Sequence, residues 1–588
     1  MSKLSQFAAS CAAVVCAFGA VAQPFYQCEM TVGGYAGSTA LENFSVLVRI
    51  SPERIGGFTY GDCQPNGADI SFADMDGNAL AHEVDTWNAE GESLVWVKLP
   101  TLSGKETKFR FRWCDATPPA NDPKAVWTDY IGVWHFNALV DSMNISNSAR
   151  NDYDLGFSAS GVGSIVANAP TGKGLFCETG TVKTKDYEPE FAVGSKFTVT
   201  GWFHLPSFEG TSGKYAGIVS KKVGLAWNAN TGWYLQMNQS KTTIGLVESG
   251  SMETMYSSLP DVTKNWNHFA LISDGSAAKA YFNGSSSPGI NRSTEIKASS
   301  TEFQVGTSAG YVDEYRLRKG TVSTDWACAE YATVANADYI VAGETEILST
   351  KAILMSSNGP RYGEVSPAYG RITEPEDGKQ YVFSCTVATQ MLNNAGTTRA
   401  VCTGWKLCDL ASGELLRSSE EQGEEPFVCR HTYADDKGVS LVWQWAVEYK
   451  VTASAKAGGT VEPTEQWVRA GQSATVSATE GEGMRFLGWI GDVSRFDAVT
   501  TLDDVQKPLA LTAEFGDADQ RVVYVATTGE DGEGSGSAAA PYATMNAAVA
   551  ALGTLGTATG TVVVAEGDYE LTDTLRLTNA VRIVGAGM

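Results

Sequence analysis

The sequence is poor in charge, and poorest in positive charge. Only 19% of its 588 residues are Asp, Glu, Lys or Arg, and 43 Lys and Arg face 67 Asp and Glu. The net charge of −24 gives phosphate backbones and anionic lipid headgroups no general attraction, so we expect no nucleic-acid partner. Low charge also argues against long helices held by salt bridges.

Long apolar runs are missing beyond the first residues of the chain. Lys3 precedes an apolar run from Phe7 to Val21, which ends in the small-residue pattern Ala20-Val-Ala22. This layout is typical of a secretory signal, and we predict that residues 1–22 are cleaved off. No later stretch approaches about 18 apolar residues, so we predict no transmembrane segment and an extracellular or cell-surface location.

Catalytic motifs are missing as well. The sequence has no Gly-x-Ser-x-Gly elbow, no phosphate-binding loop and no His-Glu-x-x-His helix. Glu83 and Asp85 lie two apart in a predicted strand, as the carboxylates of some glycosidases do, but Asn88 stands where a third carboxylate would be needed. We interpret this block as a polar strand and turn, and we predict no catalytic residue.

Cysteines are few, but they are informative about the compartment. Removing the signal leaves nine of the eleven, and exported thiols normally pair. They fall into three groups: Cys28, Cys63 and Cys114; Cys177 and Cys328; Cys385, Cys402, Cys408 and Cys429. The candidate bridge is Cys177 to Cys328, whose long loop would contribute about 4 kcal/mol. The last group lacks a Cys-x-x-Cys pair, which argues against zinc; the other pairings stay open.

Glycine and aromatic residues are abundant. The chain has 61 Gly, 15 Trp, 22 Tyr and 23 Phe, which favours turns and aromatic anchors over helices. At about 150 residues per domain, the length indicates roughly four domains. We therefore predict a mostly β, multidomain protein.

The first predicted domain, residues 23–122, contains short alternating strands such as Phe44–Ile50 and Ser93–Leu99, which are typical of a β-sandwich. Within it, the segment Gly67–Pro100 resembles the bacterial domain of unknown function 2341. That resemblance implies a small sandwich of exported proteins with no established chemistry.

The second predicted domain, residues 123–343, contains strands with alternating aromatic and small residues. They are Val133–Asn137, Phe197–Phe203, Asn265–Leu271, Ala280–Gly284 and Val312–Leu317, closed by Asp325–Tyr331. In this order they resemble a laminin G-like jelly roll of the concanavalin A type. The resemblance implies sugar binding on concave faces and loops and calcium at the sheet rim.

Two sets of residues in this domain are candidates for binding. The aromatic rings that could stack on sugars are Trp202, Trp233, Tyr234 and Trp266. The carboxylates that could hold Ca²⁺ are Asp141, Asp313 and Glu314. Core packing for the rings and solvation for the carboxylates are the structural alternatives. His135, His204 and His268 have no companion at metal-ligand spacing, and we interpret them as structural.

Two further sections share a pattern. Residues 352–447 contain Gly363–Pro367 followed by Thr403-Gly-Trp405, and residues 448–517 contain Gly459–Pro463 followed by Leu487-Gly-Trp489. The second section resembles the internalin-type B-repeat, and the first is a looser relative. Such modules are usually spacers with a small core centred on a Trp.

The last section, residues 521–588, has an apolar strand, a helical segment after Pro541 and further short strands. It resembles the start of a pectate-lyase-like right-handed parallel β-helix. Only about two coils fit, where a solenoid usually needs three or more, so we expect the sequence to end within a longer solenoid.

These features predict a secreted or cell-surface protein whose jelly roll binds a polysaccharide or glycoprotein, with Ca²⁺ as the only expected cofactor and the repeats as spacers. One alternative is the targeting region of a polysaccharide lyase or glycoside hydrolase whose active site lies beyond residue 588. Another is a passive stalk without a ligand. Ligand identity and oligomeric state stay open.

Overall fold

The computed structural model describes residues 25–585 apart from short gaps. These gaps are residues 116–117, 141–143, 151–153, 158–161, 185–195, 207–215, 223–230, 239–240, 249–250, 258–264, 275–276, 287–289, 292–301, 307–309, 349–350, 374, 421–423, 435–436, 533–535, 554–559, 572–573, 576 and 578–579. The predicted signal lies outside the described residues. Within them, no helix has the length and apolar character needed to cross a membrane.

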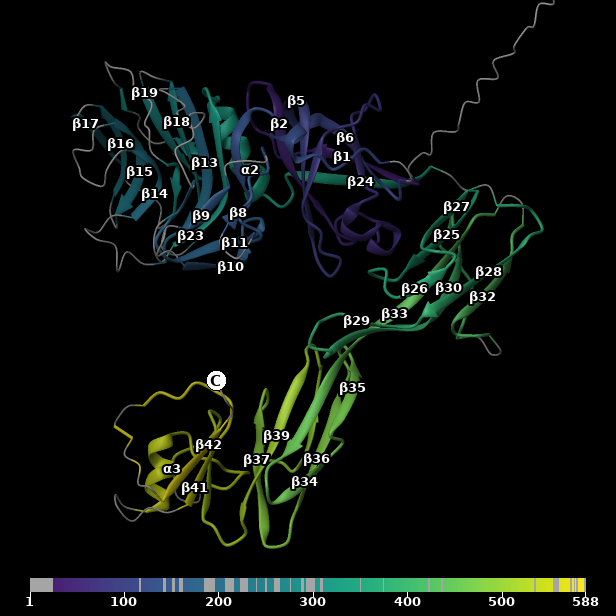
Figure 1. The fold of residues 1–588 in the computed structure, drawn as a ribbon, viewed down its shortest axis with the longest axis vertical. Helices are drawn as coiled ribbons and strands as arrows, with labels where there is room; N and C mark the ends of the chain where they lie inside the picture. The colour runs from purple at the N-terminus through teal and green to yellow at the C-terminus, as the bar shows by residue number, and fades with distance from the viewer. Residues whose placement is uncertain are drawn as a thin grey trace, which may run out of the picture. The chain divides into compact units, whose positions relative to one another are not determined.

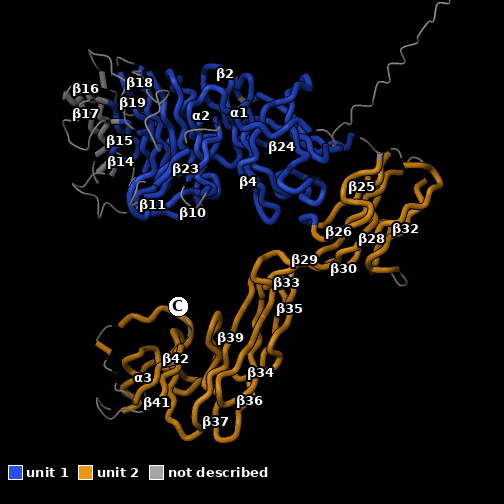
Figure 2. Tube along the Cα trace, viewed as in Figure 1, with its two compact units in different colours: residues 1–350, 359–361 blue, residues 351–358, 362–588 orange. Residues whose placement is uncertain are grey.

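The chain divides into two compact units, residues 1–350 with 359–361 and residues 351–358 with 362–588 (Figure 2). Both are built almost entirely of β-strands, which confirms the predicted fold class (Figure 1).

The first unit begins with the predicted β-sandwich. One sheet has the order β24-β1-β6-β3 and the other β2-β5-β4. The strands are β1 (Tyr26–Val32), β2 (Leu41–Ile50), β3 (Ser71–Ala73), β4 (His82–Thr86), β5 (Ser93–Leu102), β6 (Thr107–Trp113) and β24 (Ile340–Ile347). Every second side chain of β1 is buried, as expected for a strand with one face on a core.

Strand β24 ties the two domains of this unit together. It follows the jelly roll in sequence but pairs antiparallel with β1, so that Val32 lies opposite Ile340 and Tyr26 opposite Ile347. The chain therefore leaves the sandwich, forms the jelly roll and returns to complete the first sheet. The predicted domain boundary at residue 343 falls inside this strand.

The jelly roll consists of two sheets packed face to face. One follows the order β10-β11-β23-β13-β18-β19-β20, with β7 on β23 and β21 on β19; the other has the order β17-β16-β15-β14-β22-β12-β9-β8. The strands of the first sheet are β7 (Tyr130–Trp134), β10 (Val162–Ala169), β11 (Gly172–Thr179), β13 (Lys196–His204), β18 (Asn267–Asp274), β19 (Ala277–Phe282), β20 (Ser285–Ser286), β21 (Ile290–Asn291) and β23 (Gly310–Lys319). Those of the second are β8 (Asn144–Ile145), β9 (Leu155–Phe157), β12 (Val182–Thr184), β14 (Ala216–Lys222), β15 (Thr231–Asn238), β16 (Lys241–Glu248), β17 (Ser251–Ser257) and β22 (Gln304–Val305). The core between them includes Trp134, Phe197 and Phe269.

Two helices accompany the jelly roll, the single turn α1 (Pro123–Val126) and α2 (Thr324–Ala335). The Ser323 hydroxyl caps α2 by accepting a hydrogen bond from the Trp326 amide. The Trp326 ring packs edge-on against Phe44 of the sandwich at 4.9 Å, and the Leu47 amide donates to Thr333 Oγ1 at 2.9 Å. Helix α2 therefore lies between the jelly roll and the sandwich (Figure 1).

The second unit contains the two repeats, called here the first module (residues 352–447) and the second module (residues 448–517). They share one large sheet with the path β27-β25-β33-β30-β29, to which β31, β35, β39 and β37 add; each also has a small sheet, β26-β28-β32 or β34-β36-β38. The strands of the large sheet are β25 (Ala352–Ser357), β27 (Gly370–Thr373), β29 (Thr389–Met391), β30 (Thr398–Asp409), β31 (Leu415–Ser418), β33 (Val439–Ala455), β35 (Glu465–Arg469), β37 (Met484–Gly491) and β39 (Leu509–Asp517). Those of the small sheets are β26 (Glu364–Ser366), β28 (Gln380–Val387), β32 (Val428–Thr432), β34 (Gly459–Glu462), β36 (Ala474–Glu480) and β38 (Val499–Leu502).

Strand β33 belongs to both modules. Its first half pairs with β25 and β30, and its second half with β35 and β39. The predicted boundary between residues 447 and 448 therefore lies inside a continuous strand of 17 residues.

The last section forms a small parallel sheet, β40 (Val522–Val525), β41 (Gly560–Val564) and β42 (Val581–Gly585), with helix α3 (Met545–Leu552) between the first two strands in sequence. Thr544 Oγ1 caps α3 by accepting from the Ala547 amide. The parallel order agrees with the expected strand–helix–strand succession, and the β-helix itself stays a prediction.

Candidate functional site

A row of half-buried aromatic side chains crosses four neighbouring strands of the jelly roll. Phe176 of β11 lies directly opposite Tyr311 of β23, which lies opposite His204 of β13. Trp266 immediately precedes β18, where Asn267 is paired with Phe203, so its position continues the row beside His204. We call Phe176, Tyr311, His204 and Trp266 the aromatic row.

Strand alternation places the row on the outer face of its sheet. The neighbours Leu175, Phe203 and Val312 are buried in the core between the two sheets. Since successive side chains of a strand point to opposite faces, Phe176, His204 and Tyr311 point away from that core. All four members of the row are partly exposed.

The rings of the row are in contact. Phe176 and Tyr311 have centroids 4.7 Å apart, and His204 stacks on Tyr311 at 5.3 Å with 17° between the planes. Trp266 lies 6.1 Å from both His204 and Tyr311. Such a strip offers apolar faces with polar edges, the chemistry that suits the faces of sugar rings.

The structure separates the four predicted stacking residues. Trp266 belongs to the aromatic row, whereas Trp202, Trp233 and Tyr234 are 5%, 2% and 5% exposed. Trp233 stacks on Phe197 inside the jelly-roll core, and Trp202 stacks on Tyr331 of α2. Trp233 and Trp202 therefore have the alternative role, core packing, and Tyr234 is buried. Phe176, Tyr311 and His204 were missed, because only the strand register places them beside Trp266.

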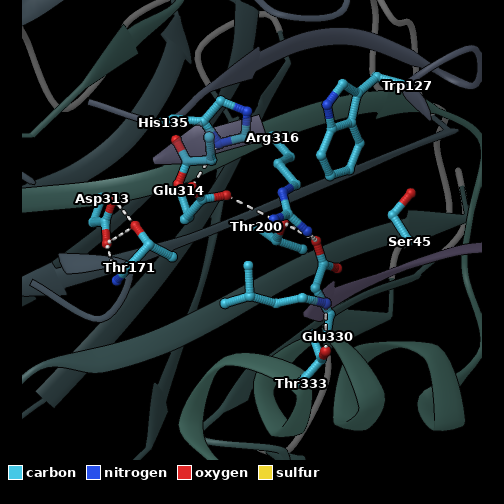
Figure 3. A network of polar contacts seen from close by, with 12 residues as sticks. Ser45, Trp127, His135, Thr171, Thr200, Asp313, Glu314, Arg316, Glu330 and Thr333 are labelled. Atoms are coloured by element: carbon cyan, nitrogen blue, oxygen red, sulfur yellow. Dashed lines mark hydrogen bonds and ion pairs between the residues drawn. The ribbon is translucent and has the colours of Figure 1, made fainter. Parts of the chain in front are cut away.

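A second cluster of polar groups is buried where the sandwich meets the jelly roll. Its centre is Arg316 of β23, whose Nη2 donates to Glu314 at 2.6 Å and whose Nη1 donates to Glu330 of α2 at 2.9 Å (Figure 3). The guanidinium also lies 4.2 Å from the Trp96 ring and 4.6 Å from the Trp127 ring. All these charged side chains are at most 5% exposed.

A β-bulge in β23 brings the acidic residues to this interface. Thr200 pairs with Arg316 and Trp202 with Asp313, so that Gly201 alone opposes Glu314 and Tyr315. Glu314 has φ of 52°, a conformation uncommon outside glycine. Because Val312 and Tyr315 both face the core, the bulge turns Asp313 and Glu314 together toward the outside of the sheet.

His135, which directly follows β7, links these carboxylates to the sandwich. Its Nδ1 lies 2.6 Å from Glu314 Oε1 and its Nε2 3.2 Å from Glu83 Oε2. Trp127 Nε1 donates to the same Glu83 oxygen at 2.5 Å. The Glu83 and Asp85 block thus contacts jelly-roll residues, and the 6% exposure of Glu83 leaves it no access to a polymeric substrate. His135 has a structural role as predicted, although its partners were not foreseen.

The cluster shifts the pKa values of its members in opposite directions. Burial would lower the pKa of His135, but the charges of Glu314, Glu83 and Asp85 raise it well above its usual value. Burial would raise the pKa values of Glu83 and Glu314, but His135 and their hydrogen bonds hold both below the usual value. For Asp85 burial dominates and raises the pKa to about 7.

Two of the three predicted calcium ligands, Asp313 and Glu314, have protein partners in this arrangement. Asp313 accepts hydrogen bonds from the Thr171 amide at 3.1 Å and hydroxyl at 2.9 Å (Figure 3), and burial followed by the Glu314 charge raises its pKa. Asp141 lies outside the described residues. Asp85, His135 and Glu314 have ligand atoms within 4.8 Å of one another, but His135 already contacts a carboxylate through each ring nitrogen. Calcium binding stays a prediction.

The structure does not bring together Cys177 and Cys328, the two residues of the predicted bridge. Cys177 is part of the jelly-roll core, while Cys328 lies on α2 and donates from Sγ to the Gly284 carbonyl at 3.0 Å. The two residues therefore lie on opposite sides of the sheet, a separation that sequence spacing does not reveal.

Comparison with known families identifies two segments of the chain. Residues 177–325 match the concanavalin A-like lectin/glucanases superfamily, and residues 449–519 match the divergent InlB B-repeat domain. Both resemblances expected from the sequence are thereby confirmed. The resemblances of Gly67–Pro100 and of residues 521–588 stay predictions. No curated protein matches the chain.

Solved structures give only distant similarities. Domain 4 of the extracellular arabinanase AbnA from Geobacillus stearothermophilus, in complex with arabinotriose, is 15% identical with a TM-score of 0.28, covering 35% of this chain and 98% of that domain. The binding domain of Paraclostridial Mosquitocidal Protein 1 is 11% identical with a TM-score of 0.30, covering 60% and 76%. Trypanosoma rangeli sialidase with the inhibitor DANA is 12% identical with a TM-score of 0.28, covering 45% and 43%. Similarity at this level says nothing of what this chain binds.

Proposed function

We propose that the chain is an exported binding protein whose jelly roll recognises a carbohydrate, free or on a glycoprotein, through the aromatic row. The observation that carries this proposal is the row of four contacting, partly exposed rings. The match of residues 177–325 to a superfamily of lectins and glucanases supports the same ligand class.

The row suits a ligand that lies across the strands. Ser164 is exposed and pairs with Phe176 at one end, and Asn265 is exposed beside Trp266 at the other. Polar groups at both ends of an apolar strip match a sugar chain, which alternates flat faces with hydroxyl groups.

The buried cluster has a different role in this proposal. Arg316, Glu314, His135 and Glu83 hold the sandwich against the jelly roll and are enclosed. They position β23 and β13, the two strands that contribute Tyr311 and His204. The proposed function is therefore recognition without catalysis at this cluster.

The direct test is a glycan array probed with the full chain, with and without added calcium, followed by calorimetric titration of the strongest glycan. Trp266→Ala and Tyr311→Ala should each weaken binding about tenfold, because each removes one stacking face. Phe427→Ala, which removes a 40% exposed ring from the first module, is the matched control and should bind as wild type. Absence of any glycan bound under both calcium conditions would overturn the proposal.

The comparison of binding with and without calcium also tests whether Ca²⁺ is a cofactor. Loss of binding in a chelator, restored by calcium, would support the proposed role of Asp141, Asp313 and Glu314 as calcium ligands. Equal affinity in both arms would contradict it and leave the aromatic row as the complete recognition element.

The second candidate function is the targeting region of a polysaccharide lyase or glycoside hydrolase. The observation that favours it is the parallel sheet of β40, β41 and β42, the expected beginning of a β-helix. Sequencing the gene beyond codon 588 separates the two candidates: further coils carrying clustered Asp, Lys and Arg would favour the enzyme.

A further inference from the structure

Two cysteines of the first module are buried in the same core. Cys385 lies on β28 of the small sheet, and Cys402 lies on β30 of the large sheet. Both belong to the same apolar core and are 9% and 2% exposed. Their strands are joined through β29, and the Cys402 amide donates to the Ala388 carbonyl at 2.8 Å where the chain passes from one sheet to the other.

The two thiols are neighbours in this core. Interaction with the Cys402 side chain is the first cause of the raised pKa of Cys385, and interaction with Cys385 lowers the pKa of Cys402. Their sulfur atoms lie 3.7 Å from the Val387 carbonyl and 3.6 Å from the Gly404 carbonyl. Side chains that interact in this way are within the reach that a disulfide requires.

The second module shows what normally occupies these two positions. Val365 pairs with Cys385 in the first module, and the corresponding strands of the second pair Val461 with Ala478. Cys402 stands immediately before the bulge that leads to Trp405, and Phe486 holds that place before Trp489. The first module therefore has two thiols where the second packs Phe486 and Ala478 into its core.

Other pairings within the first module fit less well. Cys429 lies opposite Phe383, which makes it a diagonal neighbour of Cys385 on the adjacent strand. Diagonal side chains are about 7–8 Å apart, beyond the span of a disulfide. Cys408 lies six residues farther along β30 than Cys402, roughly 20 Å at the rise of a strand.

We propose that Cys385 and Cys402 form a disulfide that joins the two sheets of the first module when the chain folds in an oxidising compartment. One thiolate attacks a small-molecule disulfide and releases a thiol, and the second thiolate then attacks the mixed disulfide and releases another. Two cysteine thiols lose two protons and two electrons, and the small disulfide is reduced to two thiols. Because both residues are buried, the exchange takes place before the core closes.

The test is refolding of the full chain from denaturant with glutathione disulfide or with reduced glutathione alone. After alkylation and digestion, mass spectrometry should find Cys385 joined to Cys402 only in the oxidised sample, with Cys408 and Cys429 alkylated in both. Alkylation of both Cys385 and Cys402 after oxidative refolding would overturn the proposal, as would linkage of either to another cysteine.

A second measurement keeps the test independent of the peptide map. Adding a reductant should lower the unfolding midpoint of the first module by on the order of 10 °C in wild type. Cys408→Ala/Cys429→Ala, the matched control, should show the same shift, and Cys385→Ala/Cys402→Ala should show none. An equal shift in both double variants would contradict the pairing; if the second variant does not fold, the wild-type peptide map alone decides.

Discussion

The two modules of the second unit have the same architecture but different sequence signals. Each has a three-stranded small sheet whose strands follow in chain order, and each has a strand that reaches a buried Trp after a glycine bulge. Yet, of the two modules, only the second matches a family model, over residues 449–519. The first module places an extra strand, β29, between its small sheet and the Trp strand, which lengthens the spacing from Pro to Trp. Backbone pairing is therefore retained where the sequence spacing is not.

The bulge glycine and the buried tryptophan are two features that the modules share. Trp405 Nε1 donates to the Glu425 carbonyl at 2.9 Å, and Trp489 Nε1 donates to the Asp497 carbonyl at 3.1 Å. Each buried ring therefore has a partner for its polar atom. Substitutions at these shared features test how similar the two modules are in stability.

Removing either central Trp should have the largest effect. Both rings are fully buried, so Trp405→Ala and Trp489→Ala should each cost about 3–5 kcal/mol of the free energy of unfolding through the cavity and the lost hydrogen bond. Hydrogen exchange of the full chain reports the opening energy of each module. A cost below about 1 kcal/mol would show that the ring is not the centre of its core.

Substitution of the bulge glycine should have a different cost in each module. A Cβ at Gly404, where φ is 147°, would lie 2.0 Å from Ser419 Oγ, the acceptor of the Trp405 amide. At Gly488 the nearest atom would be the Arg495 carbonyl oxygen at 3.2 Å. Gly404→Ala should therefore cost about 2 kcal/mol and Gly488→Ala about half as much. Equal costs by hydrogen exchange would contradict this difference.

The buried cluster of the first unit should make the free energy of unfolding of that unit depend on pH. The two modules of the second unit serve as the internal reference. The pKa values of His135 and Asp85 are raised, so the folding stability that these two groups contribute is lost as pH rises. For Asp85 this loss occurs between about pH 4 and pH 7. The pKa values of Glu83 and Glu314 are lowered, so their stabilisation is lost as pH falls below about 4.5.

Asp85→Asn should reduce the loss of unfolding free energy at rising pH by on the order of 1 kcal/mol, because the Asn amide is already neutral. Unfolding curves of wild type and variant between pH 4 and 9 measure this difference. Parallel profiles for the two proteins would show that Asp85 does not titrate in this range.

The smallest expected effect concerns the junction of the modules. Arg399 of the first module pairs with Glu448 at 2.7 Å and lies 4.2 Å from the Trp467 ring of the second. Arg399→Ala should cost about 0.5–1 kcal/mol, because the pair is partly exposed. If hydrogen exchange in the second module is unchanged while that in the first speeds up, the contact does not couple them.

Strand positions were predictable from alternation, and the long-range partners were not. Phe197–Phe203 and Val312–Leu317 were expected as strands and lie within β13 and β23. The return of β24 to β1 joins residues more than 300 positions apart, and local patterns contain no information about it. The continuity of β33 was missed because two family-like segments suggested a boundary inside it.

The candidate sites show the same limit. Asp313 and Glu314 stood out as carboxylates, and Glu83 and Asp85 as a separate block, but only the fold connects Glu314 to Glu83 through His135. One local signal was available: Val312 and Tyr315, three apart in a strand, break the alternation and indicate a bulge. Trp266 was recognised as a candidate, whereas its three companions depend on register.

Strand β33 also determines how the second unit responds to force. Tension applied along the chain enters the first module and leaves the second through one unbroken backbone, with no linker between them to extend. Because the strand is hydrogen-bonded along both halves, we expect the two modules to resist stretching as a single element. A boundary placed anywhere between Val439 and Ala455 when the gene is cut for expression would remove a central strand from one of them.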